Sequence, residues 1–168
     1  MRQHFRLCTL ALVASFAANA EPPPAEHRVL EQDDAPVEIV EYTANYQRGS
    51  SSRYSREGIR HRVTYRNVGD RKIVALQFGL LSFNIFNEFQ DRLGGYTIQD
   101  VAPGESLTGE WLASAIAESA FYTGVAYVSK VRFEDGEVWS ADLDKVAKQV
   151  QEVEEEFSVE SLRSDKGS

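Results

Sequence analysis

The sequence predicts an all-β protein, a sandwich of about seven strands followed by a C-terminal α-helix. Runs rich in β-branched and aromatic residues alternate with turn signals between residues 37 and 140. No helical pattern separates one run from the next, which argues against an α/β fold. From residue 141 the chain becomes acidic, and its apolar residues recur at helical spacing. The length of 168 residues suits one compact domain.

The first element, residues 1–20, has the layout of a secretory signal peptide. Arg2 and Arg6 give a basic start, apolar and small residues follow, and Ala18-Asn19-Ala20 fits a cleavage site. Cleavage near Ala20 removes Cys8, the one cysteine, and two of the 18 basic residues, so the charge becomes −10. We therefore expect a periplasmic or extracellular protein with no disulfide and no transmembrane segment in the mature chain.

The next elements are a leader and the strands. Residues 21–36 contain four prolines and few apolar residues, which indicates a flexible or extended leader. We predict strands at Val37–Tyr46, Ile59–Asn67, Ile73–Leu81, Tyr96–Val101, Ser106–Leu112, Gly124–Phe133 and Glu137–Ser140. Alternation is clearest in the second strand, and the third is a nearly continuous apolar run, as expected of a central strand. Residues 83–89 are predicted to continue the third strand irregularly.

Three stretches of this region carry a family resemblance. They are Val63–Asp70 with the following Ile73–Leu76, then Pro103–Glu105, and finally Val131–Trp139. They resemble the immunoglobulin-like FxLYD type of bacterial extracytoplasmic domain, in which a strand ends in Asn before a short turn. The resemblance covers roughly residues 37–140, and Asn84–Asn87 departs from the family's usual aspartate and glycine. It implies an immunoglobulin-like β-sandwich that serves as an accessory or interaction module, without catalytic residues.

The last predicted element is an amphipathic helix over residues 141–158. Its contact face follows a spacing of three and four residues and consists of Leu143, Val146, Val150, Val153 and Phe157. An isolated helix of this length is marginal in water, so it needs a surface to lie on. That surface is either the protein's own sandwich or a second subunit, which would make a homo-oligomer. Residues 159–168 are predicted to be a frayed tail.

Composition and motifs argue against several classes of function. A net charge of −8 is unfavourable for nucleic-acid binding. His61 lies on the apolar side of its predicted strand, where a core role is more common than catalysis. No histidines or cysteines stand at metal-ligand spacing, and Gly49-Ser50-Ser51-Ser52 is not a nucleophile elbow. We therefore expect no enzyme activity, no metal and no cofactor.

A basic stretch is one candidate binding surface. Eight basic and two acidic residues lie between Arg48 and Lys72, and strand period places Arg60, Arg62 and Arg66 on one sheet face. Arginine forks suit carboxylates and phosphates, so this face could bind an acidic polysaccharide, a lipid head group or an acidic protein. The alternative is that Glu38, Glu41 or Glu110 on neighbouring strands neutralises it.

An apolar cluster is the second candidate surface. Phe83, Ile85, Phe86 and Phe89 are too apolar for an ordinary loop. If exposed, they mark a partner site; otherwise they belong to the core. The leading hypothesis is a secreted, non-enzymatic module that binds another macromolecule, either a protein or an anionic component of the cell envelope. The alternative is a module for carbohydrates or small ligands, with Trp111, Trp139 or Tyr96 as stacking platforms.

Overall fold

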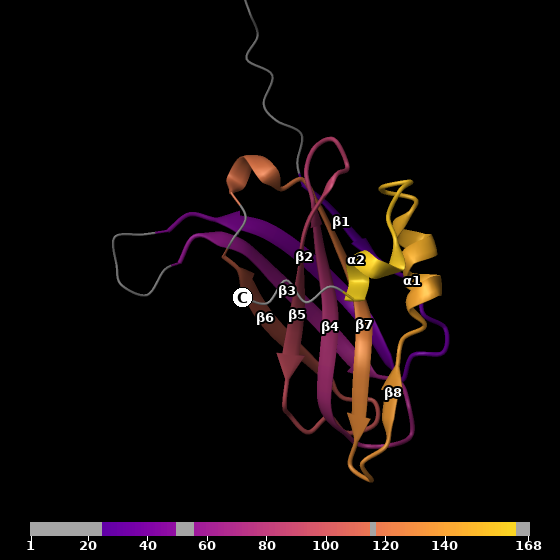
Figure 1. Ribbon diagram of the computed structural model, residues 1–168. Coiled ribbons are helices and arrows are strands. Elements are labelled where there is room, and N and C mark those ends of the chain that lie inside the picture. The colour runs from indigo at the N-terminus through magenta and orange to yellow at the C-terminus, as the bar shows by residue number, and fades with distance from the viewer. Residues whose placement is uncertain (1–24, 50–55, 115–116, 164–168) are drawn as a thin grey trace, which may run out of the picture.

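Two sheets packed face to face form the body of the molecule, with two short helices on one side (Figure 1). The computed structural model describes residues 25–49, 56–114 and 117–163. The strands are β1 Glu26–Val29, β2 Val37–Gln47, β3 Gly58–Asn67, β4 Ile73–Phe83, β5 Phe89–Thr97, β6 Ser106–Ala113, β7 Thr123–Phe133 and β8 Val138–Ser140. The helices are a 3-10 turn Glu118–Ala120, α1 Leu143–Val150 and α2 Val159–Arg163. The predicted all-β sandwich with a C-terminal helix is thus confirmed, whereas the predicted signal peptide lies outside the described residues.

The strand order is that of an immunoglobulin-like sandwich. One sheet has the order β2-β3-β6, and the other has the order β1-β7-β4-β5 with β8 also on β7. In immunoglobulin lettering, the first sheet is A-B-E, and β5, β4, β7 and β8 are C′, C, F and G. Seven strands therefore lie within residues 37–140, as predicted, and β1 is an eighth.

The main core lies between the two sheets. β3 alternates buried and exposed residues along most of its length, and Val63 and Tyr65 are buried on its inner side. Tyr65 packs against Phe78 of β4, whose ring also contacts Trp111 of β6. Asn67 ends β3: its amide donates to the carbonyls of Arg71 and Val101, and its oxygen accepts from the Gly69 N–H. These bonds fix the turn that leads into β4.

Within residues 21–36, predicted as a flexible or extended leader, Glu26–Val29 form a strand that the sequence did not predict. These four residues form β1, which runs parallel to the first residues of β7. All four are exposed, so burial of their side chains does not explain the strand. The open edge of β7 supplies the hydrogen bonds, and Gln32 extends them by bonding both the N–H and the carbonyl of Val128. The edge of β7, far away in the sequence, therefore orders residues 26–29, whose local composition predicts disorder.

The third strand turns back earlier than predicted. Residues 84–88 form a tight turn, and β5 covers Phe89–Thr97 instead of Tyr96–Val101. β5 was missed because Gly94 and Gly95 have low strand propensity. Close packing explains why residue 95 is glycine, since a Cβ there would lie 2.9 Å from the Trp111 ring. Hydrogen bonding along β4 maintains the strand despite its composition.

The helical tail is also shorter than predicted. Asp142 caps α1 by accepting from the N–H groups of Asp144 and Lys145, but the helix ends at Val150 instead of residue 158. Glutamates crowd the following residues, where the negative end of the helix dipole opposes them. The chain turns, and Val159–Arg163 forms α2 instead of fraying, because Leu162 is buried. Neither α1 nor α2 is long and apolar enough to cross a membrane.

Candidate functional site

The β4–β5 hairpin ends in a turn that presents two apolar side chains to solvent. Ile85 is 50% exposed and Phe86 is 79% exposed. The Asn84 side chain fixes this turn, because its oxygen accepts from the N–H groups of Phe86 and Glu88 and its amide donates to the Glu88 carboxylate. Asn87 adopts a left-handed φ of 62° that asparagine tolerates well. We call residues 84–88 the hairpin tip; it projects from the upper end of the molecule (Figure 1).

Phe83 does not belong to an exposed cluster with Ile85 and Phe86. Its side chain is fully buried, with ring centroids 5.7 Å from Phe89 and 6.0 Å from Phe157. The predicted binding role of Phe83 is therefore wrong, since the residue anchors the C-terminal segment to the sheet. The division falls at Asn84, where β4 ends and the turn begins.

The three predicted arginines lie on one exposed face, and each of them pairs with a carboxylate of a neighbouring strand. Arg60 and Arg62 each donate to Glu110, at 2.7 and 2.6 Å, and Arg66 donates to Glu38 at 2.5 Å. The hydrogen bonds from Arg60 and then Arg62 hold the pKa of the Glu110 carboxyl below its ordinary value. Of the two interpretations of this face, the geometry therefore favours the one in which carboxylates of neighbouring strands occupy the arginines, with Glu110 shared by two of them.

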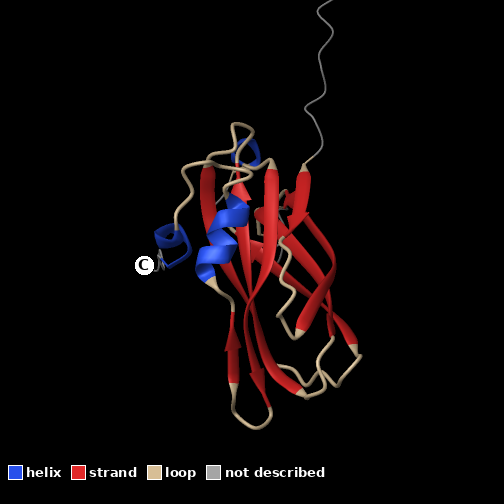
Figure 2. Ribbon diagram, turned by 90° about the vertical axis from the view of Figure 1, so that its right-hand side faces the viewer, coloured by secondary structure: helices blue, strands red, loops and turns tan. Residues whose placement is uncertain are grey.

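The predicted contact face of the helix packs on the protein's own sheet. Val146, Val150, Val153 and Phe157 are buried and Leu143 is partly buried, all against Leu81, Phe83, Val125 and Tyr127 of β4 and β7. Figure 2 shows α1 lying against the upper half of this sheet. Of the two surfaces left open by the sequence, the structure shows the protein's own sheet, which within one chain already covers the apolar side chains that a homo-oligomer through this face would use.

His61 is a core residue, as its position predicts. It is fully buried, and its Nδ1 lies 2.9 Å from the Tyr42 hydroxyl, with the two rings stacked. Burial, with a smaller effect from the charge of His27, lowers the pKa of His61 to about 4. His27 of β1 donates to the carbonyl of Ala44 at 2.7 Å. His61 is thus neutral near pH 7 and buried between the two sheets.

The three aromatic residues predicted as stacking platforms differ in exposure. Trp111 and Trp139 are partly buried against the core, and Trp111 donates from Nε1 to the carbonyl of Tyr96. Tyr96 is 67% exposed on the outer face of β5. The structure therefore leaves Tyr96 as the available platform.

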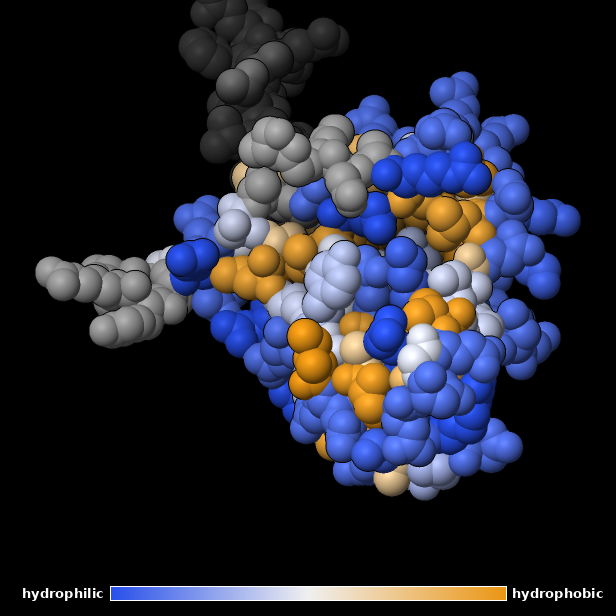
Figure 3. Space-filling model, turned by 60° about the horizontal axis from the view of Figure 1, so that its bottom comes forward, coloured by the Kyte–Doolittle hydropathy of each residue, from blue (hydrophilic) through white to orange (hydrophobic). Residues whose placement is uncertain are grey.

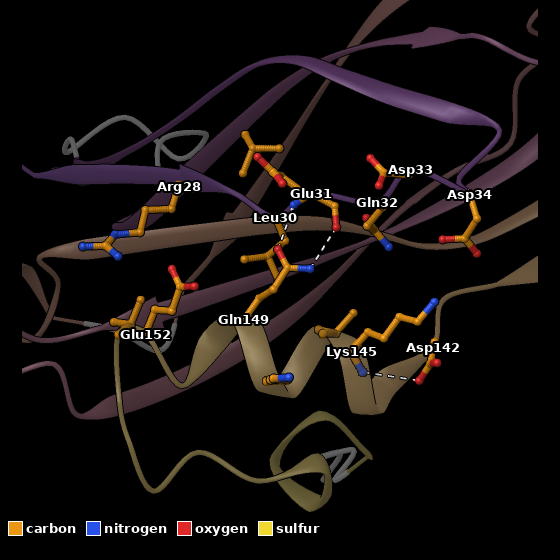
Figure 4. A pocket seen from close by; sticks show the side chains of 14 residues that line it. Arg28, Leu30, Glu31, Gln32, Asp33, Asp34, Asp142, Lys145, Gln149 and Glu152 are labelled. Carbon is orange, nitrogen blue, oxygen red and sulfur yellow. Dashed lines mark hydrogen bonds between the residues drawn. The ribbon is translucent and has the colours of Figure 1, made fainter.

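Sequence reasoning missed an open cleft between the leader and α1. It encloses about 650 Å³. Figure 4 shows Gln149 of α1 bonded to the backbone of Glu31, with its amide donating to the carbonyl and its oxygen accepting from the N–H. The charged lining residues are of both signs: Arg28, Glu31, Asp33, Asp34, Asp142, Lys145, Lys148 and Glu152. This mixed lining selects no ligand charge, and the cleft marks the place where α1 holds the leader.

Within residues 25–49, 56–114 and 117–163, no three His, Cys, Asp or Glu side chains gather as a metal site would require. No family model matches the chain, and no curated protein matches it. A hypothetical protein of Peptoclostridium difficile 630 has a similar solved structure, with a TM-score of 0.51 and 10% identity over 71% of this chain and 93% of that chain. This likeness is one of fold.

Two other solved structures align less well. A structural-genomics target has a TM-score of 0.41 and 14% identity over 63% of this chain and 80% of its own. A Bordetella pertussis protein provisionally assigned as ApaA has a TM-score of 0.37 and 13% identity over 70% of this chain and 90% of its own.

Proposed function

We propose that the protein is a secreted, non-enzymatic interaction module of the bacterial cell envelope that docks another protein through the hairpin tip. The observation that carries this proposal is the exposure of Ile85 and Phe86 on a turn that the Asn84 side chain fixes. Large apolar side chains at the end of a rigid turn are costly to hydrate, and they are the kind of anchor that fills a pocket on a partner.

The turn also lowers the entropic cost of docking. Asn84 bonds to the backbone of Phe86 and Glu88 before any partner is present, so the conformation that binds is already formed. Binding by a preorganised segment loses less conformational entropy than binding by a mobile loop. Most of the free energy released when Phe86 is buried in an apolar pocket of the partner therefore contributes to binding, because little of it is spent on ordering the turn.

The chemistry around the tip favours a protein over a membrane surface. Glu88 is the charged residue within the tip, and Asn84 holds its carboxylate at 2.7 Å. A segment that binds anionic lipids usually carries clustered lysines or arginines. An apolar pocket with a polar rim suits Ile85, Phe86 and Glu88 better.

Other features support the wider proposal. The signal-peptide layout of residues 1–20 supports an envelope location. The asparagine-pinned turn after β3, followed by the apolar strand β4, fits the proposed FxLYD-type assignment. Neutral His61 in the core and the pairing of the β3 arginines with carboxylates support a role without catalysis.

The test places a photo-activated cross-linking amino acid at position 86 in cells of the source organism. We expect it to capture one dominant partner, identified by mass spectrometry. The purified partner should bind the Ile85→Ser/Phe86→Ser variant at least about tenfold more weakly than the wild type. Both side chains are exposed, so the melting temperature should stay nearly unchanged.

The matched control is Val40→Ser/Val68→Ser, which removes two other exposed apolar side chains. This variant should bind the partner as the wild type does. Equal binding by the wild type and the Ile85→Ser/Phe86→Ser variant would exclude the tip as the docking site.

A further inference from the structure

The second surface is the lower half of the outer face of the five-stranded sheet. The C-terminal helices cover Leu81, Phe83, Val125 and Tyr127 on the upper half of this face. Below them the face is open, and Figure 1 shows β8 lying beside β7 there with no helix over it. Gln77 of this half and Phe83 near the hairpin tip are about 20 Å apart along β4, so the two surfaces are separate.

Strand register places the residues of this open half in rows. Tyr96 pairs with Gln77, Gln77 with Lys130, and Lys130 with Ser140, which makes one row across β5, β4, β7 and β8. In the next row Ala75 pairs with Arg132, and Arg132 with Val138. Two strand spacings separate the backbones of Tyr96 and Lys130, or about 10 Å. The face thus has an aromatic ring at one edge and two cations near its centre.

The ring of Tyr96 lies down on the sheet. Gly94 has no side chain beneath it, and a Cβ there would lie 3.0 Å from Cε2 of Tyr96 and 3.1 Å from Nε2 of Gln77. The Gln77 amide donates to the Tyr96 hydroxyl at 2.8 Å, which fixes the ring and leaves the hydroxyl proton free to donate. With 67% of the residue exposed, the ring face turned from the sheet is open for stacking.

The two cations differ from the arginines of β3 because no carboxylate among the described residues pairs with them. Lys130 and Arg132 are exposed, and neither makes an ion pair with any residue that the structure describes. Arg132 lies near the β7–β8 turn, but Asp135 and Glu137 of that turn pair with Arg71, and Glu134 pairs with Lys72. Unpaired cations concentrated in a protein of net charge −8 indicate a site for an anion.

We propose that this face binds an anionic polysaccharide that carries carboxylates, with one sugar ring stacked on Tyr96 and carboxylates on Lys130 and Arg132. The face of a tyrosine ring packs well against the C–H face of a sugar. Lysine and arginine make charge-assisted hydrogen bonds to carboxylates. The roughly 10 Å between the two features allows one polymer to reach both across the strands.

The shape of the surface favours a glycan over an acidic peptide or a lipid. A peptide gains specificity from pockets for its side chains or from an open strand edge, whereas this face presents a flat ring and polar groups. A lipid surface needs a continuous apolar patch. Figure 3 shows the lower end of the molecule, where apolar residues lie as islands among polar ones. Two cations are also too few for general nucleic-acid binding.

The test measures binding of the purified protein to polygalacturonate by isothermal titration calorimetry at low salt, with dextran as the neutral polymer. We expect binding to polygalacturonate and none to dextran. Lys130→Ala/Arg132→Ala and, separately, Tyr96→Ala should each weaken binding at least about tenfold, while Tyr96→Phe, which keeps the ring, should stay within about threefold. All three residues, Tyr96, Lys130 and Arg132, are exposed, and melting temperatures check that each variant is folded.

The matched control is Lys145→Ala/Lys148→Ala, which removes the same charge from two exposed lysines of α1 that form no ion pair within the described part of the chain. It should reduce affinity less than twofold. Equal losses in the two double variants would reveal general charge attraction and overturn the proposal, as would wild-type affinity in Tyr96→Ala or a failure of polygalacturonate to bind. Polyglutamate binding with the same dependence on Tyr96 would assign the face to acidic peptides instead. None of these outcomes depends on the hairpin tip.

Discussion

His61 shows how a single buried residue couples stability to pH. Burial lowers its pKa from 6.5 to about 4 in the folded protein, while the unfolded chain keeps the ordinary value. Between these two values the unfolded state binds more protons than the folded state. Stability therefore falls as the pH drops below 6.5, and the full contribution is present at neutral pH and above.

We expect the His61→Gln variant to lose less stability on acidification than the wild type does. Between pH near 7 and pH near 4.5, His61 accounts for a loss of about 2 to 3 kcal/mol in the free energy of unfolding. Urea titrations of both proteins at the two pH values measure how much free energy of unfolding each loses. The contribution of the carboxylates is the same in both proteins and cancels in the comparison. Equal acid sensitivity would show that His61 does not titrate in this range.

Individual residues also show what a sequence can reveal. The alternation in residues 59–67 correctly predicts that Val63 and Tyr65 are buried and that Arg60 and Arg62 are exposed. It offers Glu38, Glu41 and Glu110 as partners but cannot show that Arg60 and Arg62 share Glu110, because Glu110 lies about 50 residues away on another strand. Lys130 and Arg132 were overlooked for the same reason. A cation becomes conspicuous only when its neighbours on adjacent strands are known.

At the scale of elements, the leader and α1 stabilise each other through one side chain. The amide of Gln149 donates to the Glu31 carbonyl at 2.8 Å and its oxygen accepts from the Glu31 N–H at 2.9 Å. It thus takes the place of a neighbouring strand residue for the segment after β1. Local propensity predicts neither this contact nor β1, since both depend on residues about 100 positions away.

The Gln149→Ala variant should loosen the leader without melting α1. Alanine favours helix, so any change reports the lost bonds to Glu31 and not the helix itself. Two lost hydrogen bonds of about 1 kcal/mol each predict roughly tenfold faster hydrogen exchange or more in residues 26–31. Mass spectrometry of peptides from the exchanged protein measures the exchange rate of these residues.

Two variants sharpen that measurement. Gln149→Glu keeps the acceptor for the Glu31 N–H and loses the donor, so its effect should lie between wild type and Gln149→Ala. Lys148→Ala changes an exposed neighbour in α1 and should leave exchange unaltered. Unchanged exchange in Gln149→Ala would mean that the β7 edge suffices to hold the leader.

On the scale of the whole molecule, the five-stranded sheet has a core on each face. The inner face packs against β2, β3 and β6, and the upper half of the outer face packs under α1 and α2. The sequence predicted the first core from strand alternation. It did not decide whether the helix packs on the protein's own sheet or on another subunit, because the helical spacing of Val146 and Phe157 is the same for both surfaces.

Removing the C-terminal segment distinguishes these two uses of the helix. A chain ending at Ser140 exposes Leu81, Phe83, Val125 and Tyr127, which α1 and α2 otherwise cover. Because Phe157→Ala in such a site typically costs about 3 to 5 kcal/mol, we expect the truncated chain to lose at least that much free energy of unfolding. A chain ending at Ser158 keeps Val153 and Phe157 but loses Leu162, so its stability should be intermediate. Urea titration and sedimentation of the three chains give stability and mass together. A change in apparent mass with stability preserved would instead mean that the helix assembles subunits.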